Sequence, residues 1–177
     1  MRLFIAAELP ENLLEALAET SARLRDAVKG RYVAPDSFHL TLAFLGEVGA
    51  NRIDAAARTI DDACQGFEEF EIALGPLGSF GKRSSATLWQ GLSEQGALSE
   101  LAASVRNELR TLDFTFDEKA FKAHVTLMRK ADLAHGELPM PVTEHGTIEY
   151  VTLFRSDLSG ARPVYETLHT VTLLEKL

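Results

Sequence analysis

The chain has 177 residues, of which 46% are hydrophobic and 25% charged, a balance typical of one globular domain or of two small lobes that share a core. No apolar run approaches the roughly 18 residues of a membrane span, and the N-terminus lacks the pattern of a secretion signal, so we expect a cytoplasmic protein without membrane association. The net charge of −8 argues against a protein that coats nucleic acid, although a pocket for one phosphate needs only a few local donors.

The apolar pattern alternates along the chain between the period of a strand and that of a helix. Residues 2–8 are typical of a buried strand, and Pro10 then opens a helix whose leucines recur at helical spacing as far as residue 29. The other predicted elements are strands over 39–45, 121–128, 146–157 and 164–173, helices over 51–64 and 95–112, a strand-rich stretch over 70–92 with a turn at 78–84, and a loop over 131–141. This order predicts an α+β fold rather than a parallel sheet.

One tetrapeptide occurs twice, each time in a predicted strand. Residues 39–42 read HLTL and residues 124–127 read HVTL, at a separation close to half the chain. With no long linker between the two copies, the repeat predicts two similar lobes within a single domain that spans residues 1–177.

The spacing within the repeat places His39 and Thr41 on one face of their strand, and likewise His124 and Thr126, while the apolar residues between them face the core. If the two faces are opposed, both pairs line one cleft. Histidine titrates near neutral pH, so one ring can accept a proton while the other donates one. Threonine hydroxyls can donate to non-bridging phosphate oxygens. The arrangement favours phosphoester chemistry that needs no metal.

Other kinds of site fit the sequence less well. A single His-x-Thr is usually only an alternating strand, and it is the repetition that carries the argument. Zinc sites require three or four ligands, and neither copy has a neighbouring carboxylate or thiolate. No serine-hydrolase elbow, P-loop or dinucleotide fingerprint occurs. The single cysteine, Cys64, is expected to be a structural thiol. Three further histidines are expected to have no catalytic role: His135, His145 and His169.

At the repeated motif the sequence resembles the bacterial and archaeal RNA 2',3'-cyclic phosphodiesterases, also called 2'-5' RNA ligases, of the two-histidine phosphoesterase superfamily. The resemblance covers nearly the whole chain, and the paired motifs are its most specific part. The supporting segments are residues 1–6 with 9–10, 38–48, 86–91, 124–129 and 164–168.

The resemblance implies a bilobal α+β fold, with outer helices and a central cleft between two pseudo-symmetric antiparallel sheets. It implies hydrolysis of RNA 2',3'-cyclic phosphate ends to 2'-phosphomonoesters without metal or cofactor, and in some members the reverse 2'-5' joining. His39 would be the proton donor to the departing 3' oxygen and His124 the proton acceptor from water, although the near-symmetry gives no basis in the sequence for this division.

Two further residues follow from the resemblance. Arg129 would bind the substrate, but strand alternation places it on the side of Val125, so it reaches the cleft only if the strand bulges near Met128. Phe4 could present its ring to a base or could simply be a core residue.

The acidic charge leaves the substrate open. An RNA enzyme with this charge must gather basic residues locally, and the candidates are Lys82, Arg83, Lys122, Arg129, Lys130, Arg155 and Arg162. One alternative is a phosphodiesterase for small cyclic phosphates of nucleosides or ADP-ribose, and another is a non-catalytic module that binds RNA ends. No protein partner is evident, and a monomer is expected.

Overall fold

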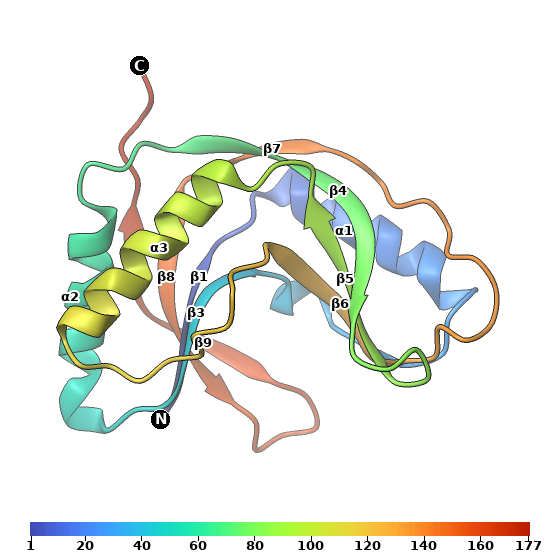
Figure 1. The fold of residues 1–177 in the computed structure, drawn as a ribbon, viewed down its shortest axis with the longest axis horizontal. Coiled ribbons are helices and arrows are strands. Elements are labelled where there is room, and N and C mark those ends of the chain that lie inside the picture. The colour runs from blue at the N-terminus through green and yellow to red at the C-terminus, as the bar shows by residue number, and fades with distance from the viewer.

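Two antiparallel sheets frame the computed structural model, which describes residues 1–177. Sheet A has the strand order β3-β1-β8-β9, and sheet B has the order β2-β6-β5-β4-β7. The strands of sheet A are β3 (Leu40–Glu47), β1 (Arg2–Ala7), β8 (Tyr150–Asp157) and β9 (Val164–Thr172). Those of sheet B are β2 (Arg31–Tyr32), β6 (His124–Ala131), β5 (Ala86–Leu92), β4 (Phe70–Phe80) and β7 (His145–Ile148). Together the sheets give the ribbon the form of an arch (Figure 1).

Three helices lie on the outer sides of the sheets. Helices α2 (Ile53–Cys64) and α3 (Gly96–Thr111) pack on each other and against sheet A, while α1 (Glu11–Arg25) lies against sheet B (Figure 1). None of the helices is both long and apolar enough to cross a membrane. The amphipathic pattern of α1 explains its position, because its leucines at 13, 17 and 24 share one face and are fully buried.

Two of the helices pack against the sheet other than the one that contains the strand before them. Helix α1 follows β1 of sheet A yet covers sheet B, and α3 follows β5 of sheet B yet packs beside β3 of sheet A. As a consequence, one continuous cluster of 40 buried residues runs through both halves of the molecule. The apolar residues of both repeated motifs belong to it, namely Leu40, Leu42, Val125 and Leu127.

The predicted fold class, α+β with two antiparallel sheets and outer helices, is confirmed. The predicted strand over 146–157 is wrong in one respect, because it is divided at Glu149 into β7 and β8, which belong to different sheets. Strand β7 pairs with β4 and β8 pairs with β1, so the chain crosses from one sheet to the other at this residue. The first helix ends at Arg25 rather than at residue 29, and the turn at 78–84 starts later because β4 continues to Phe80.

Gly78 on β4 is paired with Trp89 on β5 and lies directly beneath the indole ring. An added Cβ would overlap the ring, and Trp89 is only 8% exposed, so the ring has little room to move. We predict that Gly78→Ala lowers the free energy of unfolding by about 1–3 kcal/mol through overpacking. Urea unfolding followed by the fluorescence of Trp89, the only tryptophan, measures this effect.

Gly96→Ala is the matched control, because a Cβ at the first residue of α3 meets no atom within 4 Å. It should leave stability unchanged or raise it slightly. Equal stability of the two variants would contradict the packing of Trp89 on Gly78.

Candidate active site

The two repeated motifs lie where the sheets approach each other. His124 is the first residue of β6, and His39 directly precedes β3. Strand β3 is the edge of sheet A, and β6 is flanked on its outer side only by the two-residue β2. Strands β3 and β6 contact each other, near the centre of the view in Figure 1. The histidines are close enough that a positive charge on His124 lowers the pKa of His39.

Both imidazole rings are held by the same backbone hydrogen bond. His39 Nδ1 lies 2.7 Å from the carbonyl oxygen of Ser37, and His124 Nδ1 lies 2.6 Å from that of Lys122. A carbonyl oxygen can only accept, so Nδ1 donates in each case. This bond fixes the tautomer and leaves Nε2 of each neutral ring free to accept a proton.

Thr41 and Thr126 share the inner faces of their strands with the histidines, as strand alternation predicts. Thr41 lies opposite Ala6 of β1, and Thr126 lies opposite Trp89 of β5. Both threonines are half-buried, and neither hydroxyl is bonded to another protein group. Two free hydroxyl donors therefore lie beside the two rings.

A bulge at the last residue of each motif changes which of the following residues face inward. One extra residue, Leu42 in β3 and Leu127 in β6, has no partner on the neighbouring strand. In β6 both Leu127 and Met128 are buried, so the next residue, Arg129, turns to the inner face. The bulge that Arg129 requires is thus present.

Arg129 is exposed and makes no ion pair, and its charge lowers the pKa of both histidines. The corresponding residue of β3, five positions after its histidine, is Phe44. The Phe44 ring faces inward, as Arg129 does. The Arg2 guanidinium lies over this ring, 4.6 Å from its centroid.

Aromatic rings surround each histidine, and the sequence analysis missed most of them. The His39 ring centroid lies 4.7 Å from that of Phe4 and 5.3 Å from that of Tyr165. The His124 centroid lies 5.1 Å from that of Phe80 and 5.8 Å from that of Trp89. Tyr165 and Trp89 lie in segments that carried the family resemblance, but only the arrangement of strands brings them to the histidines.

Phe4 does not lie as a base-stacking residue would. Its ring is only 4% exposed, because it is enclosed by His39, Phe154 and Tyr165. It therefore has no open face for a base and acts as a wall behind His39. The exposed aromatic side chain next to a histidine is Phe80, which is 43% exposed.

The surroundings shift both histidines toward their neutral forms. The pKa of His39 is lowered to about 4, chiefly by burial and also by the charges of His124 and Arg129, against the opposing effect of the Ser37 carbonyl. Burial also lowers the pKa of His124, helped by Arg129 and Lys122. Removing a cation from water disfavours its charged form. Without substrate, both rings are therefore neutral at pH 7.

Two predicted cations are neutralised by carboxylates, and a third lies over an aromatic ring beside His124. Arg155 pairs with Glu166 at 3.5 Å and Arg162 with Asp36 at 4.0 Å, while Lys122 lies over the Trp89 ring at 5.5 Å. The three remaining histidines each face an acidic residue outside the site. These pairs are His135 with Asp132, His145 with Glu71, and His169 with Asp61.

The segment 131–141 packs on the outer side of sheet B. Arg23 of α1 donates to the carbonyl oxygen of Met140 at 2.9 Å, and the amide of Val142 donates to Thr20 Oγ1 at 2.9 Å. Because α1 covers the face opposite the histidines, this segment does not border them. Cys64 is buried and burial raises its pKa to about 12, which makes it unreactive, and no group of three or more His, Cys, Asp or Glu is placed to hold a metal.

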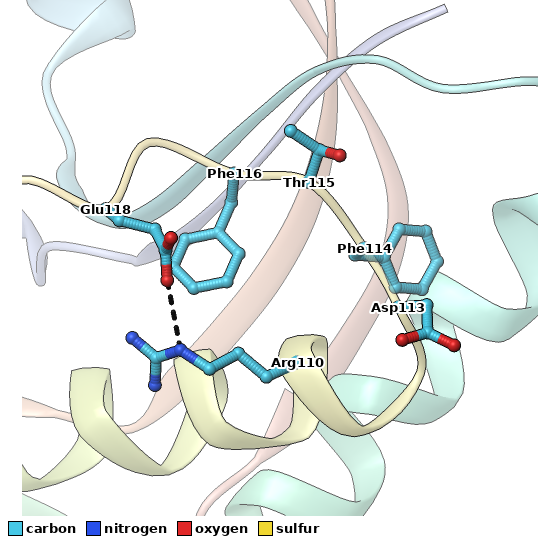
Figure 2. Close-up of a pocket in the computed structure, with 6 residues that line it drawn as sticks. All are labelled: Arg110, Asp113, Phe114, Thr115, Phe116 and Glu118. Atoms are coloured by element: carbon cyan, nitrogen blue, oxygen red, sulfur yellow. Dashed lines mark hydrogen bonds and ion pairs between the residues drawn. The ribbon is translucent and has the colours of Figure 1, made fainter.

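A surface hollow elsewhere shares no residue with this site. It lies between the end of α3 and the loop that follows, where Arg110 donates to Glu118 at 3.1 Å (Figure 2). Figure 2 shows Phe116 beside this pair and Phe114 farther along the loop, next to Asp113. The hollow contains no histidine, and its arginine is already neutralised by a carboxylate.

A family model described as the 2'-5' RNA ligase superfamily matches residues 10–150. The chain belongs to this superfamily. Relatives called RNA 2',3'-cyclic phosphodiesterase include proteins of Geobacillus stearothermophilus (31% identity over 97% of this chain), Methanothermobacter thermautotrophicus (28% over 98%) and Escherichia coli (30% over 94%). The chain spans 57% of the length of the first relative, 99% of the second and 93% of the third.

Solved structures of the superfamily share the fold. TT0787 of Thermus thermophilus superposes with a TM-score of 0.87 at 27% identity, over the whole of both chains. E. coli LigT complexed with 3'-AMP superposes with a TM-score of 0.80 at 29% identity, over 97% of each chain. The two-sheet arrangement of this chain is therefore shared with these solved structures.

The hydrogen bonds and burial of the rings predict the NMR behaviour of the substrate-free protein. In long-range ¹H–¹⁵N spectra, His39 should show a protonated Nδ1 and an unprotonated Nε2, with a titration midpoint near 4. His124 should show the same tautomer and a midpoint also below 6.5. The protein unfolded in urea is the reference, where both rings should titrate at roughly 6.5. A midpoint for His39 above this reference would contradict the burial of its ring.

Proposed function

We propose that this superfamily member is an RNA 2',3'-cyclic phosphodiesterase that hydrolyses cyclic phosphate ends to 2'-phosphomonoesters, with His39 and His124 as a metal-independent acid–base pair. The observation that carries the proposal is the duplicated motif on adjoining strands, with each Nδ1 bonded to a backbone carbonyl at 2.6–2.7 Å. Two imidazoles in the same tautomer, each with a threonine beside it, can serve both sides of one phosphate. The names of the relatives support the substrate.

In the proposed reaction, Nε2 of neutral His124 takes a proton from water, and the water oxygen attacks phosphorus. The bond between phosphorus and the 3' oxygen breaks on the opposite side. The His39 imidazolium then gives its Nε2 proton to that oxygen, which leaves a 3'-hydroxyl and a 2'-phosphate. With a 5'-hydroxyl in place of water, the same steps form a 2'-5' linkage. Each proton transfer contributes roughly 10²–10⁴ in rate.

The threonines and Arg129 serve the phosphate itself. Free hydroxyls of Thr41 and Thr126 donate to the non-bridging oxygens, where negative charge grows in the transition state. The Arg129 guanidinium has no carboxylate partner in the protein and can bind the same oxygens as a charged fork. The proposed partners are thus RNA ends or nucleotides with a cyclic phosphate, and all the groups come from a single chain.

The pKa of His39 in the free protein is too low for a proton donor at neutral pH, and bound substrate would raise it. A cyclic phosphate carries one negative charge, and an anion beside both rings favours their protonated forms. It also neutralises Arg129, whose charge opposes protonation of His39. Phosphate binding therefore raises the pKa of His39 at the moment when a proton donor is needed.

The first test uses EDTA-treated protein and a short RNA that ends in a 2',3'-cyclic phosphate. We predict conversion to a 2'-phosphate end, visible by ³¹P NMR, and a loss of roughly 10²–10⁴ in kcat in both His39→Ala and His124→Ala. His135→Ala is the matched control and should retain full activity, since its side chain is 83% exposed and outside the site.

Three other results would point elsewhere. Full activity in either site variant would refute the paired-histidine mechanism. Turnover of small cyclic phosphates but not of RNA would favour the small-substrate alternative, which the net charge of −8 supports. Binding of RNA ends without any turnover would indicate a non-catalytic binding module.

The pH profiles of kcat/KM and kcat should differ, because the first reports the pKa values of the free protein and the second those of the complex. The profile of kcat/KM reports the free histidines, so its descending limb should lie below pH 6.5, where the last free imidazolium loses its proton. The profile of kcat reports the complex and should be displaced to higher pH, because the bound anion raises both pKa values. Coincident profiles would contradict the coupling between phosphate binding and protonation.

A further inference from the structure

We propose that Arg2 binds the phosphodiester on the 5' side of the terminal nucleotide, so that the site prefers the end of an RNA chain to a mononucleotide. This inference rests on the function proposed above and assigns a substrate class to the same site.

Arg2 is an unpaired cation on the inner face of sheet A. It lies two residues before Phe4 on β1, so the two side chains share a face, and its guanidinium lies 4.6 Å from the centroid of the Phe44 ring. Arg2 makes no ion pair. Glu47, its partner in the β1–β3 register, is instead bound to the Met1 amino group at 3.2 Å.

Arg2 lies farther from the histidines than Arg129 does, with Tyr165 between Arg2 and His39. The charge of Arg129 acts on both histidines and on Tyr165, and the charge of Arg2 also acts on Tyr165. The Tyr165 ring is in turn an edge neighbour of His39, at 5.3 Å between centroids. One guanidinium therefore lies beside the reacting phosphate, and a second lies beyond Tyr165 along β1.

In-line displacement determines which way the RNA leaves the reacting phosphate. The departing 3' oxygen receives its proton from His39, so the terminal ribose lies on the side of sheet A. From that ribose the chain continues through its 5' oxygen to the next phosphate, one nucleotide away. The inner face of sheet A offers aromatic rings of Phe44, Phe154 and Tyr165 over this interval, and Arg2 follows them.

The chemistry of Arg2 suits a phosphodiester. A guanidinium keeps its charge at every relevant pH and can bind two phosphate oxygens at once. Its stacking on Phe44 orients it before the substrate arrives, which reduces the entropy lost on binding. Arg155 of the same sheet and Arg162 of the loop between β8 and β9 are already paired with Glu166 and Asp36, so they are poorer candidates.

The experiment compares two substrates with the same terminal nucleoside. One is adenosine 2',3'-cyclic phosphate, and the other is a tetranucleotide that ends in this group. The wild-type protein should favour the tetranucleotide in kcat/KM by about tenfold or more, the value of one charged phosphate contact. Arg2→Met keeps the apolar stem over Phe44, and it should reduce this ratio to near one.

Salt dependence and two further variants make the test specific. For the tetranucleotide, the slope of log kcat/KM against log salt should become less negative by about 0.7 in Arg2→Met, the value for one lost single-strand phosphate contact. Arg2→Lys keeps the charge and should retain the wild-type slope while losing part of the preference. Arg162→Gln, which removes an exposed and paired arginine, should leave both ratio and slope unchanged.

Two results would overturn the inference alone: a folded and active wild type without preference for the tetranucleotide, or an Arg2→Met variant that loses the same factor on both substrates. The absence of turnover of either substrate by the folded wild type would instead overturn the proposed function, and this inference with it.

Discussion

Strand alternation, interrupted by one extra residue in the same place of two strands, determines what the site contains. Regular alternation brings a histidine and a threonine to the inner face, and would then turn the fifth residue after the histidine into the core. The bulges at Leu42 and Leu127 reverse this parity, so Phe44 and Arg129 face inward. Two neighbouring residues are buried at each bulge, so the inward turn of Arg129 leaves no gap in the core packing.

The pseudo-symmetry extends to the hydrogen bonds of the rings but not to their surroundings. Each Nδ1 donates to the carbonyl oxygen two residues earlier, so both histidines have the same backbone hydrogen bond. His39 is walled by the buried Phe4 and the half-buried Tyr165, whereas His124 is flanked by the exposed Phe80. The more enclosed ring has its pKa lowered to about 4, and in the mechanism proposed above this ring would be the proton donor. A donor of this kind is charged only when an anion is bound, which ties its protonation to the substrate.

The sequence was sufficient to predict the motif faces, because a period of two can be read from residue types alone. It was sufficient for the α+β class, because helical and strand patterns alternate clearly. It could not predict the bulges, since an extra residue depends on which strand becomes the neighbour. For the same reason it could not divide the stretch 146–157 at Glu149, where both halves are apolar and extended but pair with different sheets. Phe4 was ambiguous because a phenylalanine suits a core and a binding surface equally well, and its 4% exposure decides for the core.

The net charge of −8 and a phosphate site are compatible because the acidic groups are not at the site. Four arginines elsewhere are paired with carboxylates, namely Arg23 with Glu19, Arg110 with Glu118, Arg155 with Glu166 and Arg162 with Asp36. Arg2 and Arg129 on the inner faces make no such pair. Surface charges are screened over about 8 Å at physiological salt, so the distant carboxylates weaken the local field only slightly. With this arrangement the proposed site would hold a phosphate through local contacts, although the whole protein attracts nucleic acid only weakly at long range. Under the function proposed above, this combination suits the recognition of chain ends, because only the terminal phosphate and the next phosphodiester would reach the histidines and Arg2.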